Sequence, residues 1–91
     1  MARTETSTSI TVERIQTGVR IEKRILKVLK ALAEYKEMTL SDLLEGIVLH
    51  AFDGKTAFSD DTLARIVSLK EIYGLDLGAD ASHRLADSSE G

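Results

Sequence analysis

The sequence contains no cysteine and no proline among its 91 residues, and its aromatic residues are limited to two tyrosines and two phenylalanines. Without cysteine, the chain can form neither disulfides nor thiolate metal sites. Without proline, helices are not interrupted by a residue that lacks a backbone donor. Leucine, isoleucine, valine and alanine dominate the apolar residues, which favours a helical core packed by aliphatic side chains.

Long apolar runs are also missing from the sequence. No stretch reaches the roughly 18 apolar residues that a membrane-spanning helix needs. Residues 1–9 are mostly polar and lack the apolar centre of a secretory signal. We therefore expect one small soluble domain in the cytoplasm, with no membrane partner.

Residues typical of catalysis or metal binding are few and have no recognisable spacing. The two histidines, His50 and His83, do not form the pattern of a zinc or nickel site, and we interpret His50 as a partly buried interface residue. The pair Asp60-Asp61 is better explained by the positive start of a helix than by acid–base catalysis. No nucleophile–base pattern or glycine-rich phosphate loop is present. We expect no enzymatic activity, no metal and no cofactor.

Charge is unevenly distributed along the chain, although the net charge is only −3. Residues 14–36 carry seven basic and two acidic side chains, whereas residues 37–91 carry four basic and eleven acidic ones. A basic segment joined to an acidic one can direct polyanions to one face while the whole chain stays soluble. The alternative is that both segments form ordinary solvated helix faces.

Residues 15–21 alternate apolar and polar side chains with a period of two, which indicates a strand. One face carries Ile15, Thr17, Val19 and Ile21, and the other carries Gln16, Gly18 and Arg20. A single strand leaves its backbone donors and acceptors unpaired, and no second convincing strand follows. We therefore expect this strand to pair with the same strand of a second copy in an obligate homodimer.

Three helices are predicted after this strand. The first spans residues 22–36, with an apolar stripe formed by Ile25, Val28, Leu29, Leu32 and Ala33. The second follows the N-cap residue Thr39 and runs to about Phe52. The third follows the N-cap Ser59 and ends near Gly74. The sequence leaves open where this third helix packs.

The order of strand, helix, capped turn and helix resembles the ribbon-helix-helix superfamily of Arc-, MetJ- and CopG-like DNA-binding proteins. The similarity covers Ile15 to Phe52 and is carried by the hexapeptide at 16–21, the first helical stripe, Thr39 and the apolar face of the second helix. It implies a mainly α fold in which two copies form an intertwined homodimer with a two-stranded antiparallel β-ribbon. In this chain the predicted third helix extends that fold at the C-terminal side. It also implies a prokaryotic source.

The resemblance implies roles for individual residues in DNA binding. The base-contacting residues would be Gln16, Gly18 and Arg20, presented by the ribbon to the major groove. The phosphate-contacting residues would be Lys23, Arg24, Thr39, Leu40 and Ser41, the last three at a helix start that favours anions. The dimer core would consist of Thr17, Val19, Ile21, Ile25, Leu29, Leu32, Leu43, Leu44, Ile47 and Val48.

Other roles remain open for several of these side chains. Arg20 could instead be a solvated edge residue or form an ion pair with Glu22. The side chains of Lys23, Arg24 and Lys27 could form a solvated helix face rather than contact a DNA backbone.

Four segments follow from this interpretation. Residues 1–13 form a flexible N-terminal arm, residues 14–53 the dimerisation and DNA-binding domain, residues 54–75 a C-terminal helical extension, and residues 76–91 a flexible acidic tail. The leading functional prediction is a sequence-specific transcriptional regulator, a repressor, that binds double-stranded DNA as a homodimer, with further association on DNA left open. One alternative is the antitoxin of a toxin–antitoxin pair, in which residues 53–91 bind the toxin protein. The other is a dimeric interaction module without DNA binding.

Overall fold

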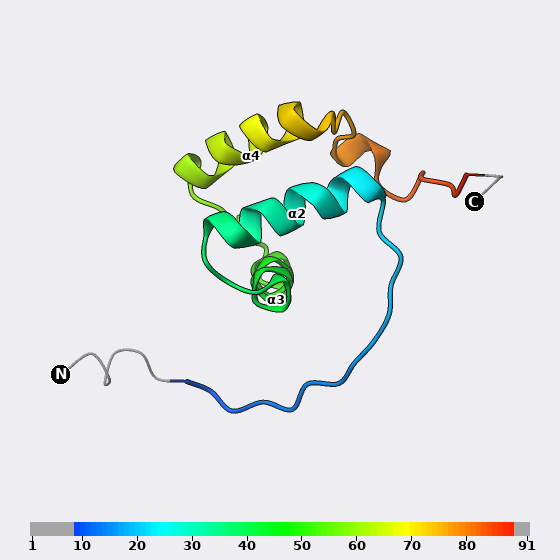
Figure 1. Cartoon of the computed structure of the whole chain (residues 1–91). Coiled ribbons are helices and arrows are strands. Elements are labelled where there is room, and N and C mark those ends of the chain that lie inside the picture. Colours follow the sequence, from blue (N-terminus) through cyan, green and yellow to red (C-terminus); the bar gives the residue numbers. More distant parts are fainter. Residues whose placement is uncertain (1–8, 89–91) are drawn as a thin grey trace.

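The computed structural model describes residues 9–88 of the chain. Within them it contains three α-helices, α2 (Lys23–Tyr35), α3 (Leu40–Phe52) and α4 (Asp60–Tyr73), followed by the short 3₁₀ helix η1 (Ala79–Ala81). Helix α2 lies between the other two, with α4 on one side of it and α3 crossing on the other (Figure 1). The segment before α2 leaves the helices and curves round to pass beside α3 (Figure 1).

The core lies where α2 meets both neighbouring helices. Leu32 is its centre, with only 1% of its surface exposed, and Ala33 and Leu43 are buried beside it. Partly buried side chains close the cluster from α2, α3, α4 and the connecting loops; they are Leu29, Met38, Ile47, Phe58, Ile66 and Leu69. The apolar stripe predicted for the first helix is therefore the face that packs, because Val28 is buried as well.

Capping residues define the starts of the helices and the end of α4. The Thr39 hydroxyl accepts the Asp42 amide at 3.0 Å, and the Ser59 hydroxyl accepts the Thr62 amide at 3.3 Å. Gly74 closes α4 in the left-handed conformation, with φ of 67°. These observations confirm the two predicted N-caps and the predicted stop of the third helix. At the start of α2, the Glu22 carboxylate accepts the Ile25 amide at 2.9 Å, a cap that the sequence analysis did not identify.

The turn between α2 and α3 places a non-glycine residue in the left-handed region. Glu37 has φ of 57°, and the following Met38 amide donates to the Ala33 carbonyl at 3.0 Å. This backbone geometry ends a helix and is usually provided by glycine. An L-residue with a Cβ is strained there by about 1–2 kcal/mol.

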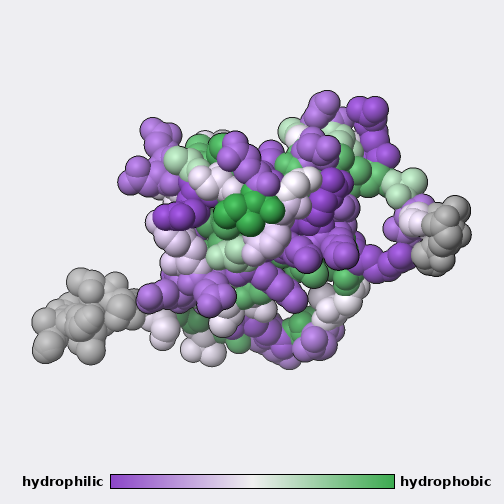
Figure 2. All heavy atoms as spheres, turned by 45° about the horizontal axis from the view of Figure 1, so that its top comes forward, coloured by the Kyte–Doolittle hydropathy of each residue, from purple (hydrophilic) through white to green (hydrophobic). Residues whose placement is uncertain are grey.

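Helix α4 contacts α2 through the core and also through a cation–π contact made by the first half of α4. The guanidinium of Arg65 lies over the ring of Tyr35, 4.3 Å from its centroid. The outer face of α4 carries exposed apolar side chains, among them Val67 and Ile72 at 57% and 70% exposure. Figure 2, turned so that the α4 side comes forward, shows apolar patches there among mostly hydrophilic side chains. None of the helices within residues 9–88 is both long and apolar enough to cross a bilayer.

The prediction of a ribbon-helix-helix fold is wrong, because residues 9–88 form an all-helical structure without a β-strand. The period-two segment 15–21 is present but unpaired: Ile15 and Val19 are 82% and 74% exposed. A strand exists only when a second segment satisfies its backbone groups, and no other part of the described chain lies in place to do so. Residues 1–8 and 89–91, which belong to the predicted arm and tail, lie outside the described residues.

Candidate nucleic-acid interface

A row of lysines runs along one exposed side of α2. Lys23, Lys27 and Lys30 are spaced by four and three residues, so they lie on one helix face, and all three are exposed. At a rise of 1.5 Å per residue the row is about 10 Å long. Within residues 9–88, none of these three amines forms an ion pair. The row is therefore a strip of exposed amines without ion-pair partners among the described residues.

The three residues expected to contact bases lie just before this row. Gln16, Gly18 and Arg20 are all exposed, and the Arg20 side chain is 81% exposed. They belong to the unpaired segment and not to a ribbon. No partner strand therefore holds their side chains on the common face that the sequence predicted. Their role in contacting bases stays a prediction.

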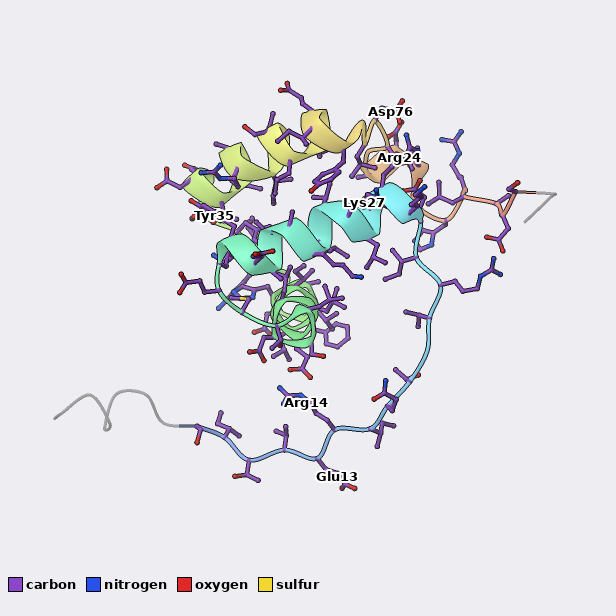
Figure 3. All side chains as sticks on the ribbon, viewed as in Figure 1. Glu13, Arg14, Arg24, Lys27, Tyr35 and Asp76 are labelled. Atoms are coloured by element: carbon purple, nitrogen blue, oxygen red, sulfur yellow. The ribbon has the colours of Figure 1, made fainter. Side chains whose placement is uncertain are left out.

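The two arginines nearest to the lysine row are already paired with carboxylates. Arg20 Nη1 lies 2.7 Å from an Asp87 carboxylate oxygen, and Arg20 does not form the alternative ion pair with Glu22, which pairs with Arg24 instead. Arg24 Nε lies 2.9 Å from a Glu22 oxygen, and Arg24 Nη1 lies 3.1 Å from an Asp76 oxygen (Figure 3). The pKa of Glu22 is lowered, first by the Ile25 amide that it accepts and then by the hydrogen bond from Arg24. The pKa of Arg24 is raised, mainly by its hydrogen bond to Glu22.

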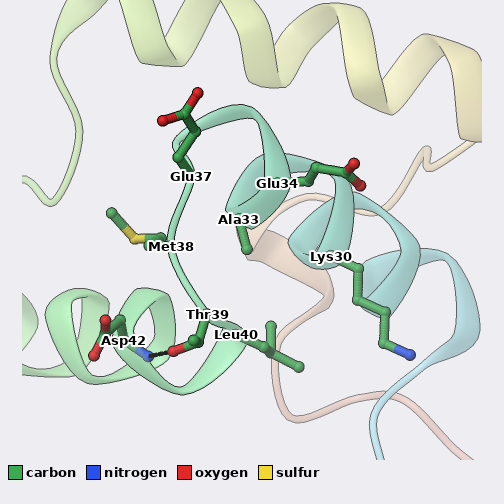
Figure 4. A pocket seen from close by; sticks show the side chains of 8 residues that line it. All are labelled: Lys30, Ala33, Glu34, Glu37, Met38, Thr39, Leu40 and Asp42. Carbon is green, nitrogen blue, oxygen red and sulfur yellow. Dashed lines mark hydrogen bonds between the residues drawn. The ribbon is translucent and has the colours of Figure 1, made fainter.

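The start of α3, expected to bind phosphate through Thr39, Leu40 and Ser41, is bordered by negative charge. Thr39 and Leu40 line a shallow pocket together with the side chains of Lys30, Ala33, Glu34, Glu37, Met38 and Asp42 (Figure 4). Three of the lining residues carry carboxylates and one carries an amine. Thr39 already accepts the Asp42 amide, so one donor of the helix start is used internally. Thr39 therefore acts as a helix cap here, and phosphate binding at this helix start stays a prediction.

An arginine that the sequence analysis did not single out joins the N-terminal segment to α3 by an ion pair. Arg14 Nε and Nη2 lie 2.8 and 2.7 Å from the two carboxylate oxygens of Glu45, a bidentate pair, and Figure 3 shows Arg14 pointing from the segment toward α3. Asp42 adds a weaker contact at 3.5 Å. The pKa of Glu45 is lowered, mainly by the hydrogen bond from Arg14. Partners 31 residues apart carry no local sequence signal, so charge pattern alone could not have found the pair.

The residues expected in a dimer core divide into two groups. Leu32 and Leu43 are buried, and Leu29 and Ile47 pack against them, so these four residues serve the core of a single chain. Thr17, Val19 and Val48 are exposed, whereas Ile21, Ile25 and Leu44 are half-buried. Of these, Val19 and Val48, together with Leu49 and Phe52, are apolar side chains that one copy leaves exposed.

No group of three or more histidine, cysteine, aspartate or glutamate side chains in the part of the chain that the structure describes could hold a metal ion. His50 is exposed, and its Nδ1 lies 2.7 Å from the Gly46 carbonyl oxygen of its own helix. The candidate site is thus a charged surface around the start of α2. Comparison of the chain with protein-family models, with curated proteins and with solved structures finds no match.

Proposed function

We propose that this chain is a sequence-specific DNA-binding regulator of transcription, a repressor, that works as a homodimer in the cytoplasm of a prokaryote. The observation that carries the proposal is the unpaired lysine row of α2, with Arg24 beside it and Arg20 just before it. A linear strip of cations matches the linear array of phosphates on a duplex, and release of counterions drives such binding.

The proposal assigns the two kinds of contact to different parts of the molecule. Lys23, Lys27 and Lys30 contact phosphates and hold the protein in place, and such contacts carry no sequence information. Gln16 and Arg20, on the exposed segment before α2, contact base edges, because Gln suits adenine and Arg suits guanine. This division does not require a paired strand.

The surface of one chain supports a homodimer. The uncovered apolar side chains of α3, with Val48, Leu49 and Phe52 between 43% and 80% exposed, are suitable for the interface of such a dimer.

The test is selection of binding sites from a randomised duplex pool with the full chain, at two salt concentrations. We expect an enriched motif and an affinity that falls with salt, with log K decreasing by about 0.9 per log salt for each phosphate neutralised. Lys27→Ala should reduce this slope by about 1 without changing the motif. Lys55→Ala, a lysine in the loop after α3, is the matched control and should leave the slope unchanged.

Arg20→Ala tests the assignment of base contacts. It should lose about 1–3 kcal/mol of discrimination at the base it contacts, so the selected motif becomes degenerate at that position. If the full chain enriched no motif and bound no duplex even at low salt, the proposal would be refuted in favour of an interaction module without DNA binding.

A further inference from the structure

The chain beyond α4 returns to the start of α2, next to the basic surface. After Gly74 it passes through η1 and runs alongside the beginning of α2 (Figure 1). Leu85, Ala86 and Asp87 line a pocket together with Arg20, Ile21 and Glu22. Two segments more than 60 residues apart in sequence are therefore neighbours in space. We call residues 75–87 the return segment.

Carboxylates of the return segment occupy the two arginines of the candidate interface. Asp87 lies 2.7 Å from Arg20 Nη1, and Asp76 lies 3.1 Å from Arg24 Nη1. The Gly74 carbonyl, at the end of α4, accepts a further hydrogen bond from Arg24 Nη1 at 3.0 Å. Figure 3 shows Asp76 beside Arg24 at the start of α2. The lysines of α2 are not contacted in this way, so the pairing is selective for the arginines.

Guanidinium groups bind carboxylate and phosphate oxygens through the same N–H donors. An Arg20 side chain held by Asp87 cannot present the same Nη1 donor to a base edge or a phosphate at the same time. The side chains of Arg20 and Asp87 are 81% and 69% exposed, so the pair is accessible and weak. An exposed ion pair contributes little energy and is screened by salt, so a polyanion can displace it.

We propose that the return segment is an intramolecular competitor of DNA, which binds Arg20 and Arg24 through Asp87 and Asp76 in the free protein and is displaced when a duplex binds. This inference rests on the proposed function. It adds a device that lowers the affinity for every duplex, because each duplex has to displace the return segment before it reaches the arginines. Weak and nonspecific complexes are penalised by the same factor as specific ones, but only the specific ones remain bound.

The test compares single aspartate-to-asparagine variants of the full chain by duplex titration at low salt. Asp87→Asn and Asp76→Asn each remove one carboxylate from an arginine. Asp80→Asn is the matched control, because it removes the same charge from the same segment and its carboxylate pairs with no cation within residues 9–88. We expect the first two variants to bind about two- to fivefold more tightly than Asp80→Asn. The difference should shrink as salt is raised.

A second measurement tests the contact without DNA. The guanidinium ¹⁵N–¹H signals of Arg20 should shift in Asp87→Asn and stay in place in Asp80→Asn, while the unfolding midpoints of both variants match that of the wild type. If the wild type bound a duplex and the three variants all had equal affinities, the competition would be refuted and the proposed function would stand. If no variant and no wild-type protein bound a duplex, both would be refuted.

Discussion

Substitution of Leu32 by alanine removes the side chain at the centre of the described core. Leu32 is the largest fully buried side chain in residues 9–88, and it touches a cluster supplied by all three helices. Exposing a buried leucine side chain to water costs roughly 1.5–3 kcal/mol. The cavity left behind raises the total loss of folding stability to about 2–5 kcal/mol. A chain of this length has a stability of about 5–14 kcal/mol, so Leu32→Ala should remove a large part of it.

The measurement is urea unfolding followed by far-ultraviolet circular dichroism. Ile72→Ala is the control, because it deletes a side chain of the same size from a position that is 70% exposed, and it should change stability by less than about 0.5 kcal/mol. Titrations at two protein concentrations add a test of the homodimer, whose midpoint rises with concentration. A loss below about 1 kcal/mol for Leu32→Ala, or equal losses for both variants, would refute the assignment of the core.

Three further predictions concern the turns and the N-terminal segment. Glu37→Gly should raise stability by about 0.5–1 kcal/mol in the same titration, because it relieves the left-handed strain, whereas Glu34→Gly inside α2 should lower it by about 1 kcal/mol. Thr39→Ala should lower stability by about 1 kcal/mol through loss of the N-cap; an unchanged midpoint would contradict that role. Because the pKa of Glu45 is lowered, its ion pair with Arg14 is fully formed at pH values above the ordinary pKa of 4.5. The pair is lost as the pH falls through the lowered pKa. Amide chemical shifts near Arg14 should follow this acid transition in the wild type and not in Glu45→Gln.

The helices could be predicted from the sequence because their determinants are local. Apolar spacing placed α2, and the caps Thr39 and Ser59 placed the starts of α3 and α4 within a residue. A helix satisfies its backbone groups within itself, so a window of about fifteen residues contains most of what decides it.

The prediction of a strand was wrong because the formation of a strand does not depend on local sequence alone. Alternation in residues 15–21 predicts which side chains share a face, but pairing depends on a second segment at a distance that the pattern does not specify. The resemblance to a ribbon-helix-helix protein supplied that second segment from another copy, and the described residues contain no such strand. The packing of α4 on α2 and the contact of Asp87 with Arg20 are likewise long-range, and neither leaves a periodic signal.

The charge distribution indicated a basic segment at residues 14–36, and the start of α2 lies in it. Contact of Lys23 and Arg24 with DNA, which the resemblance implied, stays a prediction. Sequence reasoning treated the acidic C-terminal part as a separate tail, and it did not anticipate that Asp76 and Asp87 reach the arginines. The bidentate pair of Arg14 and Glu45 was missed for the same reason.

The ring of Tyr35 beneath the Arg65 guanidinium has a spectroscopic consequence. The sequence has no tryptophan and only two tyrosines, and the second, Tyr73, closes α4. Ultraviolet emission of the protein therefore comes from two phenols, one stacked under a cation of α4 and the other at the far end of that helix. Detachment of α4 would change the surroundings of both fluorophores, so an unlabelled sample reports this motion optically.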